Sequence, residues 1–200
     1  AIHYYTLAAD QNFSEAQFNL GVIYDEGEYV KRDIKKAIHY YTLAADQNDA
    51  DAQYNLGLLY GKGKLVKRDI SKAIHYYTLA AKQNCLKAQF NLGLFYEEGE
   101  LVARDINKAI YYYSLAAEQH DEDALINLAI IYEKGEFISR DIQKAIHYYT
   151  LAANQNCTQA QLNLGVIYSA GKYISPDISK AIHYYTLAAN QKDSDAQYNL

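Results

Sequence analysis

The chain has 200 residues, of which 50% are hydrophobic and 22% are charged, a balance that excludes a disordered, collagen-like or low-complexity protein. Its 19 basic and 24 acidic residues leave a formal net charge of -5, which argues against binding of nucleic acid through the phosphates. The two cysteines form no CxxC motif and the apolar runs are short, so we expect neither a thiolate zinc site nor a membrane span in this segment.

One segment returns at a constant interval along the whole chain. AIHYYTLAA begins at residues 1, 37, 73, 145 and 181, and the variant AIYYYSLAA begins at residue 109. Every interval is a multiple of 36, without insertion or deletion. A strict period of this length indicates stacked units that are each too small to bury their own apolar face. We therefore predict a single array over residues 1–200, made of the units 1–36, 37–72, 73–108, 109–144, 145–180 and the partial unit 181–200.

The first helix of each unit is predicted from apolar positions three and four residues apart. In the second unit it extends from Asp33 to Asn48, with Tyr41 on its apolar face. Asp33 is placed to act as the N-cap, because its carboxylate can accept backbone N–H groups. Asn48 follows the helix at a position that is often left-handed, a conformation that asparagine tolerates.

The second helix of the same unit is predicted from about Asp51 to Gly61. Gly63 follows as the expected left-handed cap, and a short loop of residues 64–68 leads to the next aspartate. Gly57 lies inside this helix, where glycine costs roughly 1 kcal/mol relative to alanine. Its recurrence indicates that two helix backbones approach closely there, and Ala129, the next smallest residue, fits the fourth unit.

This unit resembles the Sel1-like repeat, a relative of the tetratricopeptide repeat. The matching residues in the second unit are Ala37, Tyr41, Ala44, Ala45, Ala52, Leu56, Gly57, Tyr60, Gly63, Val66, Asp69 and Lys72. The pattern departs from the family where Asn replaces the glycine that usually ends the first helix. It departs again where an apolar residue replaces the second loop glycine, at Tyr29, Leu65, Leu101, Phe137 and Tyr173. The resemblance implies an all-α fold, a right-handed α-α superhelix (solenoid) of 36-residue helix-turn-helix repeats.

The resemblance also implies a function. Such arrays are similar to adaptor modules that hold protein complexes together, so we expect a non-catalytic scaffold that binds a peptide or a partner helix and needs no cofactor. The alternative is a targeting or regulatory segment of a larger multidomain enzyme, such as a protein kinase. Because the sequence lacks methionine and starts within the repeat pattern, further domains of a parent chain are expected.

The candidate binding surface is the concave face that first helices line in superhelices of this kind. Side chains of three types, His or Tyr, Tyr, and Leu, recur there in rows, and such a composition is typical of peptide-binding surfaces. The candidate residues are His39, Tyr40, Leu43, His75, Tyr76, Leu79, Tyr111, Tyr112, Leu115, His147, Tyr148 and Leu151. A second interpretation stays open: the tyrosines and leucines pack between neighbouring repeats, and the histidines lie on a solvated edge.

Catalytic and metal-binding chemistry finds no support in the pattern. Catalysis needs one asymmetric group of residues, whereas nearly every polar residue here recurs with the repeat. Histidines of stacked helices lie on the order of 10 Å apart, which is too far to share a metal ion. Recognition of RNA would need a basic groove, which the net charge disfavours.

The recurring asparagine at positions 19, 55, 91, 127, 163 and 199 is expected to hydrogen-bond the backbone within the helix pair.

Two further features leave alternatives open. Cys85 and Cys157 are expected to be free thiols, which favours a reducing compartment, but sequons at Asn12 and Asn156 favour the opposite, so no compartment is assigned. Basic residues recur in the loops after the second helices. They form either a solvated edge or a site for an acidic partner or phosphopeptide, and they are Lys31, Arg32, Lys67, Arg68, Arg104 and Arg140.

Overall fold

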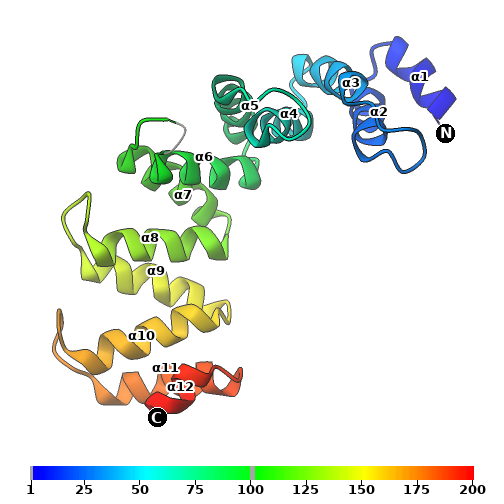
Figure 1. Ribbon diagram of the computed structural model, residues 1–200. Coiled ribbons are helices and arrows are strands. Elements are labelled where there is room, and N and C mark those ends of the chain that lie inside the picture. The colour runs from blue at the N-terminus through cyan, green and yellow to red at the C-terminus, as the bar shows by residue number, and fades with distance from the viewer. Residues whose placement is uncertain (1, 100–101) are drawn as a thin grey trace. The chain divides into compact units, whose positions relative to one another are not determined.

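The computed structural model describes residues 2–99 and 102–200, and within these ranges the regular structure is entirely helical (Figure 1). The helices are α1 (Ile2–Asp10), α2 (Ser14–Glu26), α3 (Ile34–Asp46), α4 (Ala50–Lys62), α5 (Ile70–Lys82), α6 (Leu86–Glu98), α7 (Ile106–Glu118), α8 (Glu122–Lys134), α9 (Ile142–Asn154), α10 (Thr158–Ala170), α11 (Ile178–Asn190) and α12 (Ser194–Asn199). The predicted all-α fold of 36-residue helical hairpins is confirmed.

The predicted helix ends agree with the structure to within one or two residues. The Asp33 carboxylate accepts the Lys36 backbone N–H at 3.1 Å and so caps α3, and the same bond recurs at the start of α5, α9 and α11. Gly63 ends α4 in the left-handed conformation at φ +63°, as expected. Local sequence signals therefore set both ends of each hairpin.

The second residue after each first helix is left-handed in every copy. Asn48 has φ +68°, and His120 and Lys192 adopt the same conformation where the sequence departs from asparagine. A β-carbon in this conformation costs roughly 1–2 kcal/mol, which asparagine offsets in part through local hydrogen bonds. Lysine has no such compensation, so position 192 carries local strain.

Replacing Lys192 with glycine is expected to raise the free energy of unfolding by about 1 kcal/mol, because glycine adopts a positive φ without steric cost. The measurement is urea denaturation followed by circular dichroism. Gln191→Gly is the contrasting control, because Gln191 has φ -88° and donates to Gln161 at 2.8 Å, so glycine there should only lower the free energy of unfolding. Stabilisation by both substitutions, or by neither, would contradict the role of the left-handed backbone.

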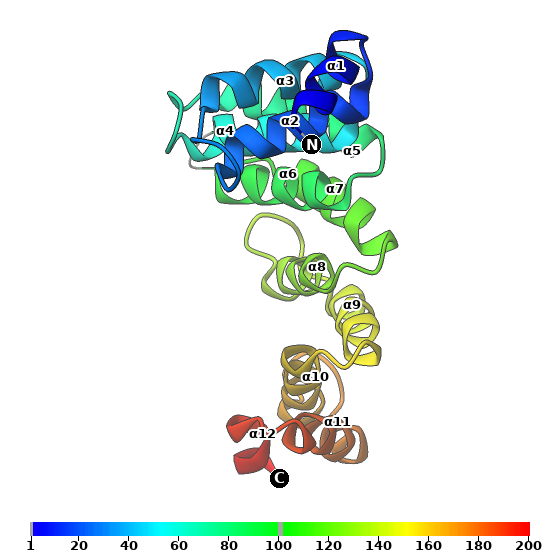
Figure 2. The same ribbon diagram turned by 90° about the vertical axis from the view of Figure 1, so that its right-hand side faces the viewer.

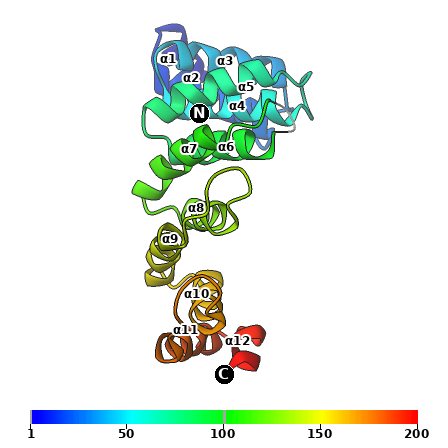
Figure 3. The same ribbon diagram turned by 90° about the vertical axis from the view of Figure 1, so that its left-hand side faces the viewer.

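Backbone contacts divide the chain into two compact units, residues 1–112 and 113–200. Within each unit, the second helix of one hairpin packs more extensively on the first helix of the next than on its own partner, as in the pairs α2–α3, α4–α5 and α10–α11. Figures 2 and 3 show α2 to α5 layered side by side in the first unit. The single array over residues 1–200 stays a prediction.

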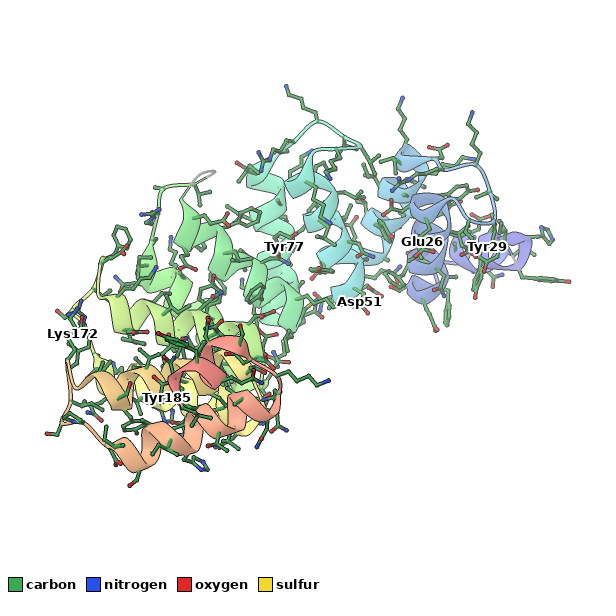
Figure 4. All side chains as sticks on the ribbon, turned by 60° about the horizontal axis from the view of Figure 1, so that its bottom comes forward. Glu26, Tyr29, Asp51, Tyr77, Lys172 and Tyr185 are labelled. Atoms are coloured by element: carbon green, nitrogen blue, oxygen red, sulfur yellow. The ribbon has the colours of Figure 1, made fainter. Side chains whose placement is uncertain are left out.

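A buried tyrosine fills each of these interfaces. Tyr77 of α5 is 2% exposed, and a β-carbon added to Gly57 of α4 would lie 2.6 Å from its ring. Gly165 has the same relation to Tyr185. Figure 4 shows Tyr77 and Tyr185 among the helices, whereas Tyr29 and Lys172 lie on loops. The predicted close approach of two helix backbones at Gly57 is therefore wrong: the lack of a side chain makes room for the ring of Tyr77 from the next helix.

Candidate functional site

Each tyrosine of the candidate face belongs to a stack of four groups. Tyr40 stacks on Tyr24 of the preceding helix, with ring centroids 5.8 Å apart and planes within 5°. Lys36 Nζ lies 4.8 Å from the centre of the Tyr24 ring, and the His39 ring contacts Tyr40 edge-on at 5.2 Å. These are favourable cation–π and aromatic geometries. The stack recurs around Tyr76, Tyr112, Tyr148 and Tyr184, with Tyr111 in place of the histidine beside Tyr112.

The structure places the three rows of candidate residues at different depths. The first row is exposed and consists of His39, His75, Tyr111 and His147. The second row is half-buried and consists of Tyr40, Tyr76, Tyr112 and Tyr148. In the third row Leu43, Leu79 and Leu115 are half-buried, whereas Leu151 is 39% exposed. Burial raises the pKa of the hydroxyls of Tyr40, Tyr76 and Tyr112. Packing between repeats thus covers one side of each tyrosine, and the histidines stay accessible.

Three of the candidate residues meet at a cavity in the second unit. His147, Tyr148 and Leu151 of α9 line a cavity of about 540 Å³, named here the α9 cavity. Its other walls are Ser114, Ala117 and Glu118 of α7, His120 and Leu125 before and in α8, and Asn154 and Gln155 at the end of α9. The volume lies within the usual range for ligand pockets. The apolar side chains thus adjoin polar groups that can orient a ligand.

A buried glutamine links neighbouring hairpins elsewhere in the chain. Gln53 is 1% exposed; its Nε2 donates to the Ala45 carbonyl at 3.2 Å, and its Oε1 accepts from Gln83 Nε2 at 2.8 Å. The same pair is formed by Gln17 with Gln47 and by Gln161 with Gln191. These glutamines are not among the residues predicted from the sequence. The signal was present, because the buried glutamine recurs at positions 17, 53, 89 and 161.

The α9 cavity lies where this glutamine pattern is interrupted. Position 125 is leucine, and its side chain is 1% exposed in the wall of the cavity. Leucine has no acceptor to offer Gln155, the counterpart of Gln83 and Gln191. Ser114 and His120 are further departures, since threonine and asparagine are common at these repeat positions. The cavity therefore combines the repeated face with residues particular to one hairpin.

Comparison with known proteins assigns the chain to a family. The Sel1 repeat model matches residues 1–13, 14–49, 50–85, 86–121, 122–157 and 158–193. The chain belongs to the Sel1 repeat family. Each full Sel1 repeat, as the family model divides the chain, joins a second helix to the first helix of the next hairpin. In the repeats 14–49, 50–85 and 158–193 this helix pair has the more extensive contacts of the two. The family repeats therefore begin at a different residue from the predicted units, but both recur every 36 residues.

Solved Sel1 repeat structures support the assignment. A protective antigen of uropathogenic Escherichia coli, c5321, is 32% identical with a TM-score of 0.88, over 98% of this chain and 42% of that protein. A Sel1 repeat protein of Oxalobacter formigenes is 37% identical with a TM-score of 0.74, over 95% of this chain and 78% of that protein. The chain thus spans less than half the length of the E. coli protein. No curated protein matched the sequence.

The recurring asparagines of the Sel1 repeats contact side chains as well as the backbone. The amide of Asn55 lies near the buried hydroxyl of Tyr41 and opposes the rise in its pKa that burial causes, and Asn163 has the same effect on Tyr149. Asn91 Nδ2 donates to the Lys87 carbonyl of its own helix at 2.8 Å. Asn91 therefore bonds the backbone of its own helix and not that of its partner helix, and Asn55 and Asn163 lie near a tyrosine of the adjacent helix.

The loop arginines bind the ends of the second helices. Arg68 Nε donates to the Gly61 carbonyl at 2.9 Å, and Arg140 Nε donates to the Glu133 carbonyl at 2.7 Å. Arg32 instead pairs with the Asp25 carboxylate at 2.8 Å. Helix carbonyls at a C-terminus lack intrahelical partners, and a cation there is favourable. Intrachain capping therefore accounts for much of the basic pattern in these Sel1 loops.

The two cysteines are free thiols at the starts of α6 and α10, as predicted. Burial raises the pKa of both, which lowers the reactive thiolate fraction. Cys157 is 5% exposed, whereas Cys85 is half-buried. At neutral pH we expect Cys85 to react with a disulfide reagent at least about tenfold faster than Cys157. Mass spectrometry of timed aliquots measures both sites, and equal rates in the folded protein would contradict the packing around Cys157.

Within residues 2–99 and 102–200, no group of three or more His, Cys, Asp or Glu side chains is arranged to hold a metal ion. In the same ranges, none of the helices is both long enough and apolar enough to span a membrane. Sel1 repeat folds are typically non-catalytic scaffolds.

Proposed function

We propose that this chain is a non-catalytic interaction scaffold that binds a peptide segment or a partner helix at the α9 cavity and on the first-helix face that includes it. Sel1 repeat proteins are generally protein-interaction scaffolds. The observation that carries the finer proposal is the meeting of His147, Tyr148 and Leu151 at one cavity beside the exposed amides of Asn154 and Gln155.

The chemistry of the cavity favours a partner with an apolar side chain flanked by main-chain polar groups. Leu125 and Leu151 provide an apolar surface, and Tyr148 is held in place by its stack on Tyr132 at 5.9 Å. Burial of an apolar partner side chain there stabilises a complex through the hydrophobic effect. The amides of Asn154 and Gln155 can donate to partner carbonyls, and preordered side chains lower the entropic cost of binding.

The test begins with selection of binders from a random peptide library displayed on phage. Peptides enriched by the wild-type chain are expected to share an apolar residue. Leu151→Asp is expected to weaken their binding at least about tenfold, because the new aspartate carboxylate would lose its hydration in the complex. Val166→Asp is the matched control, because Val166 is 44% exposed on α10 and lies outside the cavity. Fluorescence anisotropy gives the dissociation constants, and circular dichroism verifies the fold.

Two results would contradict the proposal. One is enriched peptides that bind Leu151→Asp as tightly as the wild-type chain. The other is an equal loss of binding with Val166→Asp, which would place the contact away from the cavity. In the first unit, the double substitution His75→Asp and Leu79→Asp tests whether the equivalent face of α5 takes part, by the same assay.

A further inference from the structure

One loop differs in charge from its copies in the other repeats. Residues 61–68, GKGKLVKR, contain four basic residues and no acidic one. The copies 25–32, 97–104 and 133–140 each contain two or three acidic residues, and the copy 169–176 contains a single lysine. Position 61 is glycine, whereas the same position in the copies 25–32, 97–104 and 133–140 is aspartate or glutamate. The second repeat therefore lacks this acidic group. Because structural residues recur with the repeat, this departure needs another explanation.

The unusual loop borders a cavity within the first unit. The cavity, named here the loop cavity, has a volume of about 300 Å³, and its walls include Asp25, Arg32, Leu58, Lys62, Lys64 and Leu65. Leu65 is 46% exposed, and both lysines are exposed. The only carboxylate of the wall, Asp25, is paired with Arg32 at 2.8 Å. Apolar surface and two cationic side chains therefore face the same space.

In the described parts of the chain, neither Lys62 nor Lys64 is paired with a carboxylate, although Lys62 lies in the last turn of α4, where a cation is favourable. Arg68 of the same loop, by contrast, binds the Gly61 carbonyl. Two like charges two residues apart repel each other, and an anionic ligand would relieve that repulsion. The volume is at the lower limit for ligand pockets, so it suits one or two side chains.

We infer that the loop cavity binds an acidic peptide segment, with carboxylates held by Lys62 and Lys64 and an apolar side chain packed against Leu58 and Leu65. Charge complementarity selects the carboxylates, and burial of the apolar group adds affinity. The overall negative charge of the chain disfavours a nucleic acid as the ligand. This site is separate from the α9 cavity and does not depend on the function proposed for it.

The test uses a fluorescein-labelled peptide, acetyl-Glu-Glu-Leu-Glu-Glu-amide, and the full chain in a fluorescence anisotropy titration at low salt. We expect saturable binding that is weakened about tenfold or more in the double variant Lys62→Glu, Lys64→Glu, and that falls as salt rises. The double variant Lys62→Gln, Lys64→Gln is expected to lie in between. The matched control is Lys82→Glu, Lys134→Glu, which makes the same change in net charge at exposed lysines outside the cavity and should bind like the wild-type chain.

Peptide variants and a nucleic acid complete the experiment. Replacing the peptide leucine with serine should weaken binding, and a Lys-Lys-Leu-Lys-Lys peptide should not bind. The inference is overturned if the wild-type chain fails to bind the acidic peptide, or if the variants Lys62→Glu, Lys64→Glu and Lys82→Glu, Lys134→Glu bind it equally. A uridine pentanucleotide is the last probe. The inference is also overturned if the wild-type chain binds it more tightly than the peptide and the variant Lys62→Glu, Lys64→Glu no longer binds it, because the ligand of the cavity would then be a nucleic acid.

Discussion

Tyr77→Ala is expected to lower the free energy of unfolding by about 3–5 kcal/mol, the usual cost of truncating a large buried aromatic side chain. Tyr77 is 2% exposed and fills the space between α4 and α5 that the lack of a side chain at Gly57 provides. Its removal would leave a cavity at the interface through which one hairpin stacks on the next. Since each hairpin in such an array is stabilised by its neighbours, the loss should affect more than one repeat.

Urea denaturation measures this effect, with two variants as controls. Tyr29→Ala removes the same side chain from a loop where it is 74% exposed, and its cost should be within about 0.5 kcal/mol of zero. Tyr77→Phe keeps the ring and should cost much less than Tyr77→Ala. A similar loss for Tyr29→Ala and Tyr77→Ala would show that the buried ring is not what holds adjacent hairpins together.

Gln53→Ala is expected to lower the free energy of unfolding by about 1–3 kcal/mol, the cost of leaving buried polar groups without partners. The substitution removes the donor to the Ala45 carbonyl and the acceptor of Gln83. Gln53→Leu should cost less, because leucine fills the space and is the residue that the chain itself has at position 125. The exposed Gln143→Ala serves as the control. Equal costs for Gln53→Ala and Gln53→Leu would indicate that the lost hydrogen bonds alone, and not the filling of the space, matter at this position.

Much of the fold could be predicted because the decisive signals are local and repeated. The Asp33 cap, the left-handed Asn48 and the Gly63 cap each depend on one residue's backbone preference, which the sequence displays directly. The exact 36-residue period then extends one hairpin to the whole chain. Agreement between local preference and global repetition makes such predictions reliable.

The candidate site was predictable only in part, because it depends on contacts between helices. The helical period places Tyr40 on the first-helix face, but the partner that stacks on it, Tyr24, belongs to the preceding hairpin. The same holds for the bond between Gln53 and Gln83, which are 30 residues apart. The α9 cavity forms around Leu125, and the sequence marks this departure without revealing the space beside it. Departures from the repeat are thus the best guide that the sequence offers to candidate sites in this chain.

The most direct test of the proposed scaffold function is a titration of the ¹⁵N-labelled chain with the peptide selected on phage, followed by amide chemical shifts. The account predicts that the largest shift changes fall on residues of the α9 cavity, among them His147, Leu151 and Gln155, and that they disappear in Leu151→Asp. Changes that cluster instead on the loop of residues 61–68, or that leave the α9 resonances unmoved at saturation, would contradict it.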